Sequence, residues 1–164
     1  IRNLTIPALL IKCKEEKHAV CPLVFSGNIL FPTDFSENAK AAFDMLTSLV
    51  SNYNPAVTLY HIQDKNIVFP HLSHKLEEFN RIDNERLNTL KESLLSAGAK
   101  NVIIKLETGH TKQSIINEIN SNDYNLIVMG TQGRGWIEEV FIGGVAHAVI
   151  RKSNTSLLLV PFRR

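Results

Sequence analysis

Leu-Ile-Val-Met at residues 126–129, followed by Gly-Thr-Gln-Gly-Arg-Gly at 130–135, is the stretch that decides how this chain folds. A compact apolar run of this kind predicts a buried strand, which the glycines end abruptly. A second glycine pair, Gly143-Gly144, lies further along the chain. Backbone N–H groups of a glycine loop can approach an anion closely, and a following helix adds its positive end. The layout predicts a site for the phosphates of a nucleotide.

Short apolar runs alternate with helical patterns outward from this stretch. Strands are predicted at residues 28–33, 56–62, 101–107, 125–130 and 156–160. Helices are predicted after the N-cap residue Ser36, ahead of Gly98, around 115–119 and over 141–149. Strand and helix in alternation predict an α/β fold, an open parallel sheet of five strands with helices on both faces.

Composition limits the classes of protein to which the chain can belong. Its 164 residues, 44% hydrophobic and 21% charged, suit one globular domain. The formal charge of +2 comes from interspersed acidic and basic residues, which argues against a nucleic-acid partner. No apolar run approaches the roughly 20 residues of a membrane helix. Cys13 and Cys21 fit neither a disulfide framework nor a zinc site, so a cytoplasmic location is expected.

The N-terminal segment falls outside the alternation. Residues 1–11 align without a gap with residues 150–160, and both read as a helix end, a turn and a strand. The hypothesis is an internal repeat in which residues 1–12 are the final strand of a preceding sister domain, 13–27 a linker and 28–164 the main domain. The alternative is an extra N-terminal strand of the same domain.

A second polar segment follows the first predicted strand, which ends in Phe31-Pro32-Thr33-Asp34. Ligands of open parallel sheets bind beyond the carboxyl ends of the strands, where the strand order reverses. If the first and fourth strands are neighbours, Asp34 faces the glycine loop and can accept hydrogen bonds from a ribose. The alternatives are that Asp34 caps a helix, that the glycines form a simple turn and that Arg134 is a solvated charge.

Other site chemistries are weakly represented. The sequence has neither the Gly-x-x-x-x-Gly-Lys-Ser/Thr loop nor a Gly-x-Gly-x-x-Gly that opens a helix. His71 and His74 lack an evident third metal ligand, and no nucleophile stands out with its base. We therefore assign no catalytic residue and no metal-binding residue.

The chain resembles the universal stress protein family over residues 27–161. Family members that bind ATP share Gly-x2-Gly-x9-Gly-Ser/Thr, which Gly130, Gly133 and Gly143 match. Residues 29–36, 59–62 and 129–134 also look like that family. The resemblance implies the strand order 3-2-1-4-5 of an adenine nucleotide alpha hydrolase-like fold. It further implies a homodimer or a tandem pseudo-dimer through the final strand, so that residues 6–11 would pair with 155–160.

The resemblance also implies which residues surround a nucleotide. Asp34 would contact the ribose, and backbone groups around Pro32-Thr33 and at Ile62 would hold the adenine. Met129 directly precedes the glycine motif and would belong to the same site. The residues around the phosphates would be Gly130, Gln132, Gly133, Arg134, Gly143, Gly144 and Val145.

One position departs from the family motif, because Gly144 stands where a hydroxyl is expected. The missing hydroxyl removes a hydrogen bond to phosphate of about 1.5–3 kcal/mol, while the backbone N–H groups remain. Nucleotide binding is expected to survive but weaken, and AMP or ADP becomes nearly as plausible a ligand as ATP.

These features lead to one functional hypothesis and two alternatives. The hypothesis is a stress-response or signalling module in which an adenine nucleotide biases a dimer or partner state and is not turned over. The first alternative is slow hydrolysis of ATP, assisted by Mg²⁺ or Mn²⁺ on the phosphates and Asp34. The second is a nucleotide-free dimerisation or interaction domain, for which Gly144 is the best argument.

Overall fold

A computed structural model of the chain describes residues 4–12, 25–64, 75–133 and 142–162. The described strands are β1 (Ala8–Leu10), β2 (Asn28–Pro32), β3 (Ala56–Asp64), β4 (Asn101–Gly109), β5 (Leu126–Gly130) and β6 (Ser156–Val160). The described helices are α1 (Glu37–Tyr53), α3 (Leu76–Ser96), α4 (Thr111–Ser121) and α5 (Gly144–Lys152). Within these residues no helix is long and apolar enough to cross a membrane.

The strands form one sheet in the order β1-β6-β5-β2-β3-β4. Strands β2 to β6 are the five that the sequence predicts; they are parallel and lie in the predicted order. The count of five was wrong, because β1 adds a sixth strand antiparallel to β6. Ala8 lies opposite Leu159 and Leu10 opposite Leu157, which confirms the pairing expected between the two chain ends.

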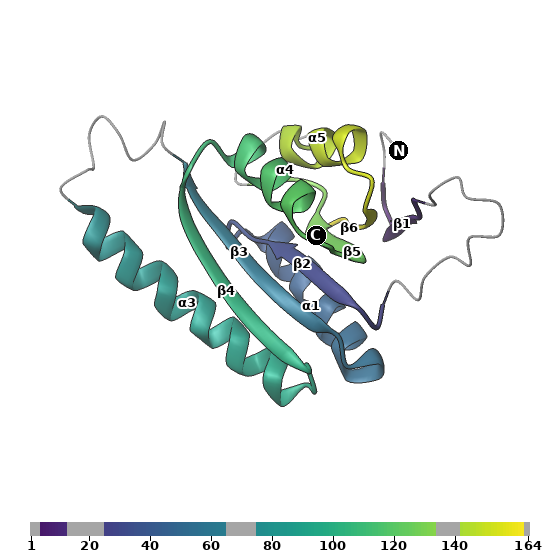
Figure 1. Cartoon of the computed structure of the whole chain (residues 1–164), viewed down its shortest axis with the longest axis horizontal. Helices are drawn as coiled ribbons and strands as arrows, with labels where there is room; N and C mark the ends of the chain where they lie inside the picture. Colours follow the sequence, from purple (N-terminus) through teal and green to yellow (C-terminus); the bar gives the residue numbers. More distant parts are fainter. Residues whose placement is uncertain (1–3, 13–24, 65–74, 134–141, 163–164) are drawn as a thin grey trace.

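Helices cover both faces of the sheet, with α1 and α3 on one side and α4 and α5 on the other (Figure 1). Successive side chains of a strand point to opposite faces. Phe31 of β2 accordingly packs with Leu46 of α1, while its neighbour Leu30 belongs to the cluster that contains Ile115 of α4 and Val149 of α5. Two apolar clusters therefore enclose a sheet whose inner strands are buried on both faces.

Local signals set the helix ends. Ser36 caps α1 as predicted, because its side chain accepts a hydrogen bond from the backbone N–H of Ala39 at 3.2 Å. Gly98 follows α3 with a φ of +105°, a conformation that favours glycine. Strands β3 and β4 run on to Asp64 and Gly109, beyond their predicted ends. This extension carries additional polar residues to the carboxyl edge of the sheet.

Candidate functional site

A cavity of about 1050 Å³ opens at the carboxyl edge of the sheet, where β2 and β5 are neighbours but their connections leave in opposite directions. All the site residues predicted from the sequence line it except Arg134, which lies outside the described residues. They are Pro32, Thr33, Asp34, Ile62, Met129, Gly130, Gln132, Gly133, Gly143, Gly144 and Val145. Residues from four separate stretches of sequence thus come together as the predicted strand order requires.

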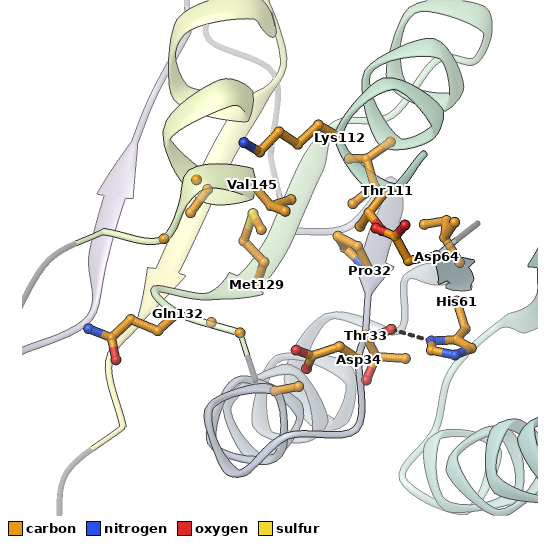
Figure 2. A pocket seen from close by; sticks show the side chains of 18 of the residues that line it. Pro32, Thr33, Asp34, His61, Asp64, Thr111, Lys112, Met129, Gln132 and Val145 are labelled. Carbon is orange, nitrogen blue, oxygen red and sulfur yellow. Dashed lines mark hydrogen bonds between the residues drawn. The ribbon is translucent and has the colours of Figure 1, made fainter. Parts of the chain in front are cut away.

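Asp34 is held in place by the turn that leads into α1. Its Oδ1 accepts hydrogen bonds from the backbone N–H of Ser36 at 3.0 Å and from the Ser36 hydroxyl at 2.6 Å. The same hydroxyl caps α1, so Asp34 supports the cap but is not the N-cap residue itself. Phe35, between them, has a φ of +59°, which is uncommon for a bulky side chain. The turn therefore fixes the carboxylate at the mouth of the cavity (Figure 2).

The glycine loop and α5 form the opposite wall. The N–H of Gly143 donates to the carbonyl of Thr131 at 2.7 Å, which ties the start of α5 to the end of β5. A Cβ on Gly143 would lie 3.3 Å from both Thr131 O and the Cα of Gln132, so this tight closure leaves little room for a side chain. Because Gly143 N–H is already engaged, an anion here would meet the N–H groups at the first turn of α5. Helical hydrogen bonding within α5 begins with His147 N to Gly143 O, at 2.9 Å.

Gln132 lines the cavity from the glycine loop. Its side chain points away from Asp34 and Lys112 in Figure 2. A role for this residue at the phosphates would therefore rely on its backbone.

A buried polar cluster of His61, Gln63 and Asp83 forms the third wall. His61 is 5% exposed; its Nδ1 lies 2.7 Å from Thr33 O, and its Nε2 lies 3.4 Å from Asp83 Oδ2. The Gln63 amide donates to the same carboxylate oxygen at 3.0 Å. The Phe35 ring packs on the imidazole with 4.6 Å between the ring centres. This cluster joins α3 to the carboxyl ends of β2 and β3.

Several lining residues were missed by the sequence analysis. They come from the start of α4 and from α3: His110, Thr111, Lys112, Phe79, Ile82, Asp83 and Arg86. His110, Thr111 and Lys112 come shortly after the predicted strand 101–107, so their place at the carboxyl edge could have been inferred from the chain order. The α3 residues offer no such signal, because their position depends on how that helix crosses the sheet.

The described residues contain no group of three or more His, Cys, Asp or Glu side chains that could hold a metal ion. A metal that accompanies a nucleotide would then draw most of its ligands from phosphate and water, as Mg²⁺ commonly does.

Comparison with known proteins gives a consistent result. The family model described as the universal stress protein family matches residues 26–161. The universal stress protein MJ0577 of Methanocaldococcus jannaschii is 27% identical over 158 residues, which cover 84% of this chain and 96% of the relative. The structure of MJ0577 superposes with a TM-score of 0.73 over 86% of this chain and 99% of its own.

Two more distant structures share the fold. A universal stress protein in complex with cAMP has a TM-score of 0.63 at 18% identity and covers 83% of this chain and 97% of its own. A universal stress protein from Archaeoglobus fulgidus DSM 4304 has a TM-score of 0.67 at 18% identity; the match takes in 98% of this chain but 52% of that protein. The matched family model spans the whole sheet from β2 to β6 together with the cavity, and the chain belongs to the universal stress protein family.

Proposed function

We propose that this chain is a stress-response or signalling module that binds an adenine nucleotide in the cavity between β2, β5 and α5. The observation that carries the proposal is the position of the Asp34 carboxylate directly opposite Gly133 of the glycine loop. The ribose would lie at Asp34, and the phosphates would extend toward the first turn of α5. A cavity of about 1050 Å³ is ample for such a ligand, since small-molecule sites usually measure about 300–1,000 Å³.

The backbone of β3 supports a place for the base. Thr33 N–H donates to Tyr60 O at 2.9 Å, so the polar backbone groups of Tyr60 face β2. Alternate residues of a strand direct their N–H and C=O groups to the same side. The backbone N–H and C=O of Ile62 therefore point to the same side of β3 as those of Tyr60. Strand β2 ends at Pro32, so at the level of Ile62 this side of β3 faces the cavity. These groups supply the donor and acceptor that an adenine edge requires.

The ligand would be ATP, ADP or AMP, with Mg²⁺ or Mn²⁺ held mainly by the phosphates. The structural neighbour in complex with cAMP supports this class of ligand. The nucleotide would act by biasing a partner state. The support for this second step is that the sequence offers no evident nucleophile with its base. In addition, residues 8–10 pair with the outer edge of β6, the strand through which the family resemblance implies association.

We also propose that residues 1–12 are the last strand of a preceding sister domain and 13–27 the linker. Strand β1 pairs antiparallel with β6, as the final strands of two domains related by a twofold axis would. Ile6 and Ile11 are 62% and 51% exposed, and a preceding domain would cover them. About half of the A. fulgidus protein matches nearly all of this chain, so that protein has the length expected of two such domains in tandem.

Release of small molecules from the denatured protein, followed by mass spectrometry, tests the proposed ligand. Recovery of AMP, ADP or ATP near one equivalent supports it. Calorimetric titration of the emptied protein with each nucleotide then compares Asp34→Ala with Asp44→Ala, a change on the exposed face of α1. We expect Asp34→Ala to weaken binding at least about 10-fold, the loss of one hydrogen bond to a charged group, and Asp44→Ala to have no effect. An empty protein that binds no added nucleotide contradicts the proposal.

A further inference from the structure

Lys112 lies close against the position that a Cβ at residue 144 would take. It is the second residue of α4, and its side chain extends toward the start of α5 beside Val145 (Figure 2). A Cβ placed on Gly144 would lie 3.0 Å from Lys112 Nζ and 3.1 Å from Lys112 Cε. The glycine that breaks the family motif is therefore the residue that lets this ammonium group approach the first turn of α5.

Lys112 forms no ion pair with the described residues, although Asp34, Asp64 and Asp83 line the same cavity. Among the described residues no carboxylate lies within 4.0 Å of Nζ, whereas Lys105, in β4, pairs with Glu118 at 2.6 Å. The first turn of α5 carries the positive end of the helix dipole. The ammonium group of Lys112 is exposed and lies beside that turn on the wall of the cavity, so an anion between the two would be attracted to both.

The start of α4, which carries Lys112, is anchored to the sheet. The hydroxyl of the preceding residue, Thr111, donates to Asp64 Oδ2 at 3.0 Å and so fixes the start of α4 against the end of β3. The next residues toward the core, Ile115 and Ile116, are buried under the sheet. Lys112 therefore extends toward Gly144 from a helix whose start is anchored to the sheet.

We propose that Lys112 is a phosphate ligand of this site and takes over the contact that the hydroxyl absent at Gly144 would have made. This inference rests on the proposed nucleotide site. It narrows the ligand to nucleoside di- or triphosphates, because an ammonium group is a point charge that gains most from the more highly charged phosphate chain. A side chain at position 144 would crowd the Lys112 ammonium group, so the cation and the hydroxyl are alternative ways to contact the same phosphate.

Titration calorimetry with ATP, AMP and inorganic tripolyphosphate tests this assignment. Lys112→Met keeps the apolar stem and removes the charge, and Lys112→Arg keeps the charge. Lys100→Met, at an exposed position on the opposite edge of the sheet, is the matched control. We expect Lys112→Met to weaken ATP and tripolyphosphate binding about 10-fold or more, the effect of one charge-assisted hydrogen bond. AMP should lose less, and Lys112→Arg and Lys100→Met should bind like the parent chain.

A double-mutant cycle tests the exclusion between positions 112 and 144. Gly144→Ser alone should weaken ATP binding, because the new side chain displaces the ammonium group. In a Lys112→Ala background the same change should strengthen ATP binding, because the hydroxyl now has room to reach the phosphate. Independent, additive effects of the two changes would contradict a shared position.

The outcomes separate this inference from the proposed function. If the parent chain binds ATP and Lys112→Met binds it equally well, the lysine has no phosphate contact and the nucleotide site stands. An equal loss of ATP and AMP also overturns the assignment, since it indicates a general disturbance of the site. If the parent chain binds none of the three probes, both proposals are wrong.

Discussion

The Asp34 carboxylate lies against Gly133: a Cβ built on this glycine would be 2.9 Å from Asp34 Oδ2. The other carboxylate oxygen, Oδ1, accepts two hydrogen bonds from Ser36 and is fixed by them. The end of β2 and the glycine loop after β5 are therefore in close contact across the mouth of the cavity. A substitution at Gly133 is therefore expected to move the Asp34 carboxylate.

Gly133→Ala should separate ligand binding from stability. The added methyl group must displace Asp34 Oδ2, the oxygen that Ser36 does not hold, so the free energy of unfolding should change by less than about 1 kcal/mol. Nucleotide affinity should fall about 10-fold, because the displaced carboxylate no longer meets the ribose. Calorimetric titration and urea unfolding measure the two quantities. In an Asp34→Ala background Gly133→Ala should have little further effect, and a full additional loss would show that the carboxylate does not mediate the change.

Asp83→Ala should destabilise the fold substantially. Asp83 is 9% exposed, and its removal leaves the buried Gln63 amide and His61 Nε2 without their shared acceptor. An unsatisfied buried polar group costs about 1–3 kcal/mol, and urea unfolding should show a loss of this size. Glu85→Ala, which removes the partner of Arg81 in a pair whose side chains are both 63% exposed, is the control and should change stability by less than about 0.5 kcal/mol. Equal effects of the two changes would contradict a structural role for the buried cluster.

Tyr60 and Tyr124 should make the fold sensitive to alkaline pH. Burial raises the pKa of both phenols above the ordinary value, and hydrogen bonds to Glu107 at 2.6 Å and Glu118 at 2.5 Å raise it further. The folded state therefore holds these protons more tightly than the unfolded state does. This contribution to stability is complete below pH of about 10, the pKa of an unfolded tyrosine, and is lost as the pH rises from there through the raised pKa values.

Urea unfolding at a series of alkaline pH values measures this loss. Tyr124→Phe should flatten the decline, because one of the two linked protons is gone. Its former acceptor, Glu118, keeps Lys105 and Asn122 as partners. Tyr53→Phe, on α1, controls for the loss of a phenol as such. Ultraviolet absorbance of phenolate in the folded protein gives a direct check: deprotonation of both phenols near pH 10 would rule out this origin.

Deletion of residues 1–12 should promote self-association. Strand β1 covers the edge of β6, and Lys12 N–H also donates to the Ser156 hydroxyl at 3.2 Å. Removal of β1 exposes a row of unpaired backbone groups along β6, which is a template for pairing with another chain. Sedimentation should show a larger mass for the shortened chain than for the intact one. Leu9→Lys, at a side chain 38% exposed, keeps the strand and serves as the control. Identical sedimentation of all three would mean that β1 does not protect the edge.

The order of the elements and the part of the cavity formed by β2 and the glycine loop were accessible from the sequence because they depend on local patterns. Apolar runs with sharp ends identified five strands, and Ser36 and Gly98 marked helix ends that the structure confirms. The rule that ligands bind beyond the carboxyl ends of parallel strands then selected Asp34 and Gly130 for one crevice. The alignment of the two chain ends also anticipated the pairing of β1 with β6, although the predicted total of five strands omitted it.

The sequence by itself determined which residues form strands, where the chain turns and which glycines stand at the cavity, because burial periodicity and steric freedom act between neighbours in the chain. Only the tertiary structure decided that Lys112 reaches Gly144 and that Asp83 of α3 meets His61 and Gln63 of β3. The physical reason is that these contacts join helices whose crossing over the sheet is set by the packing of many side chains at once. The sequence shows a missing hydroxyl at Gly144 and a lysine at position 112 as separate facts. The tertiary structure relates them, because it places both residues on the wall of the same cavity.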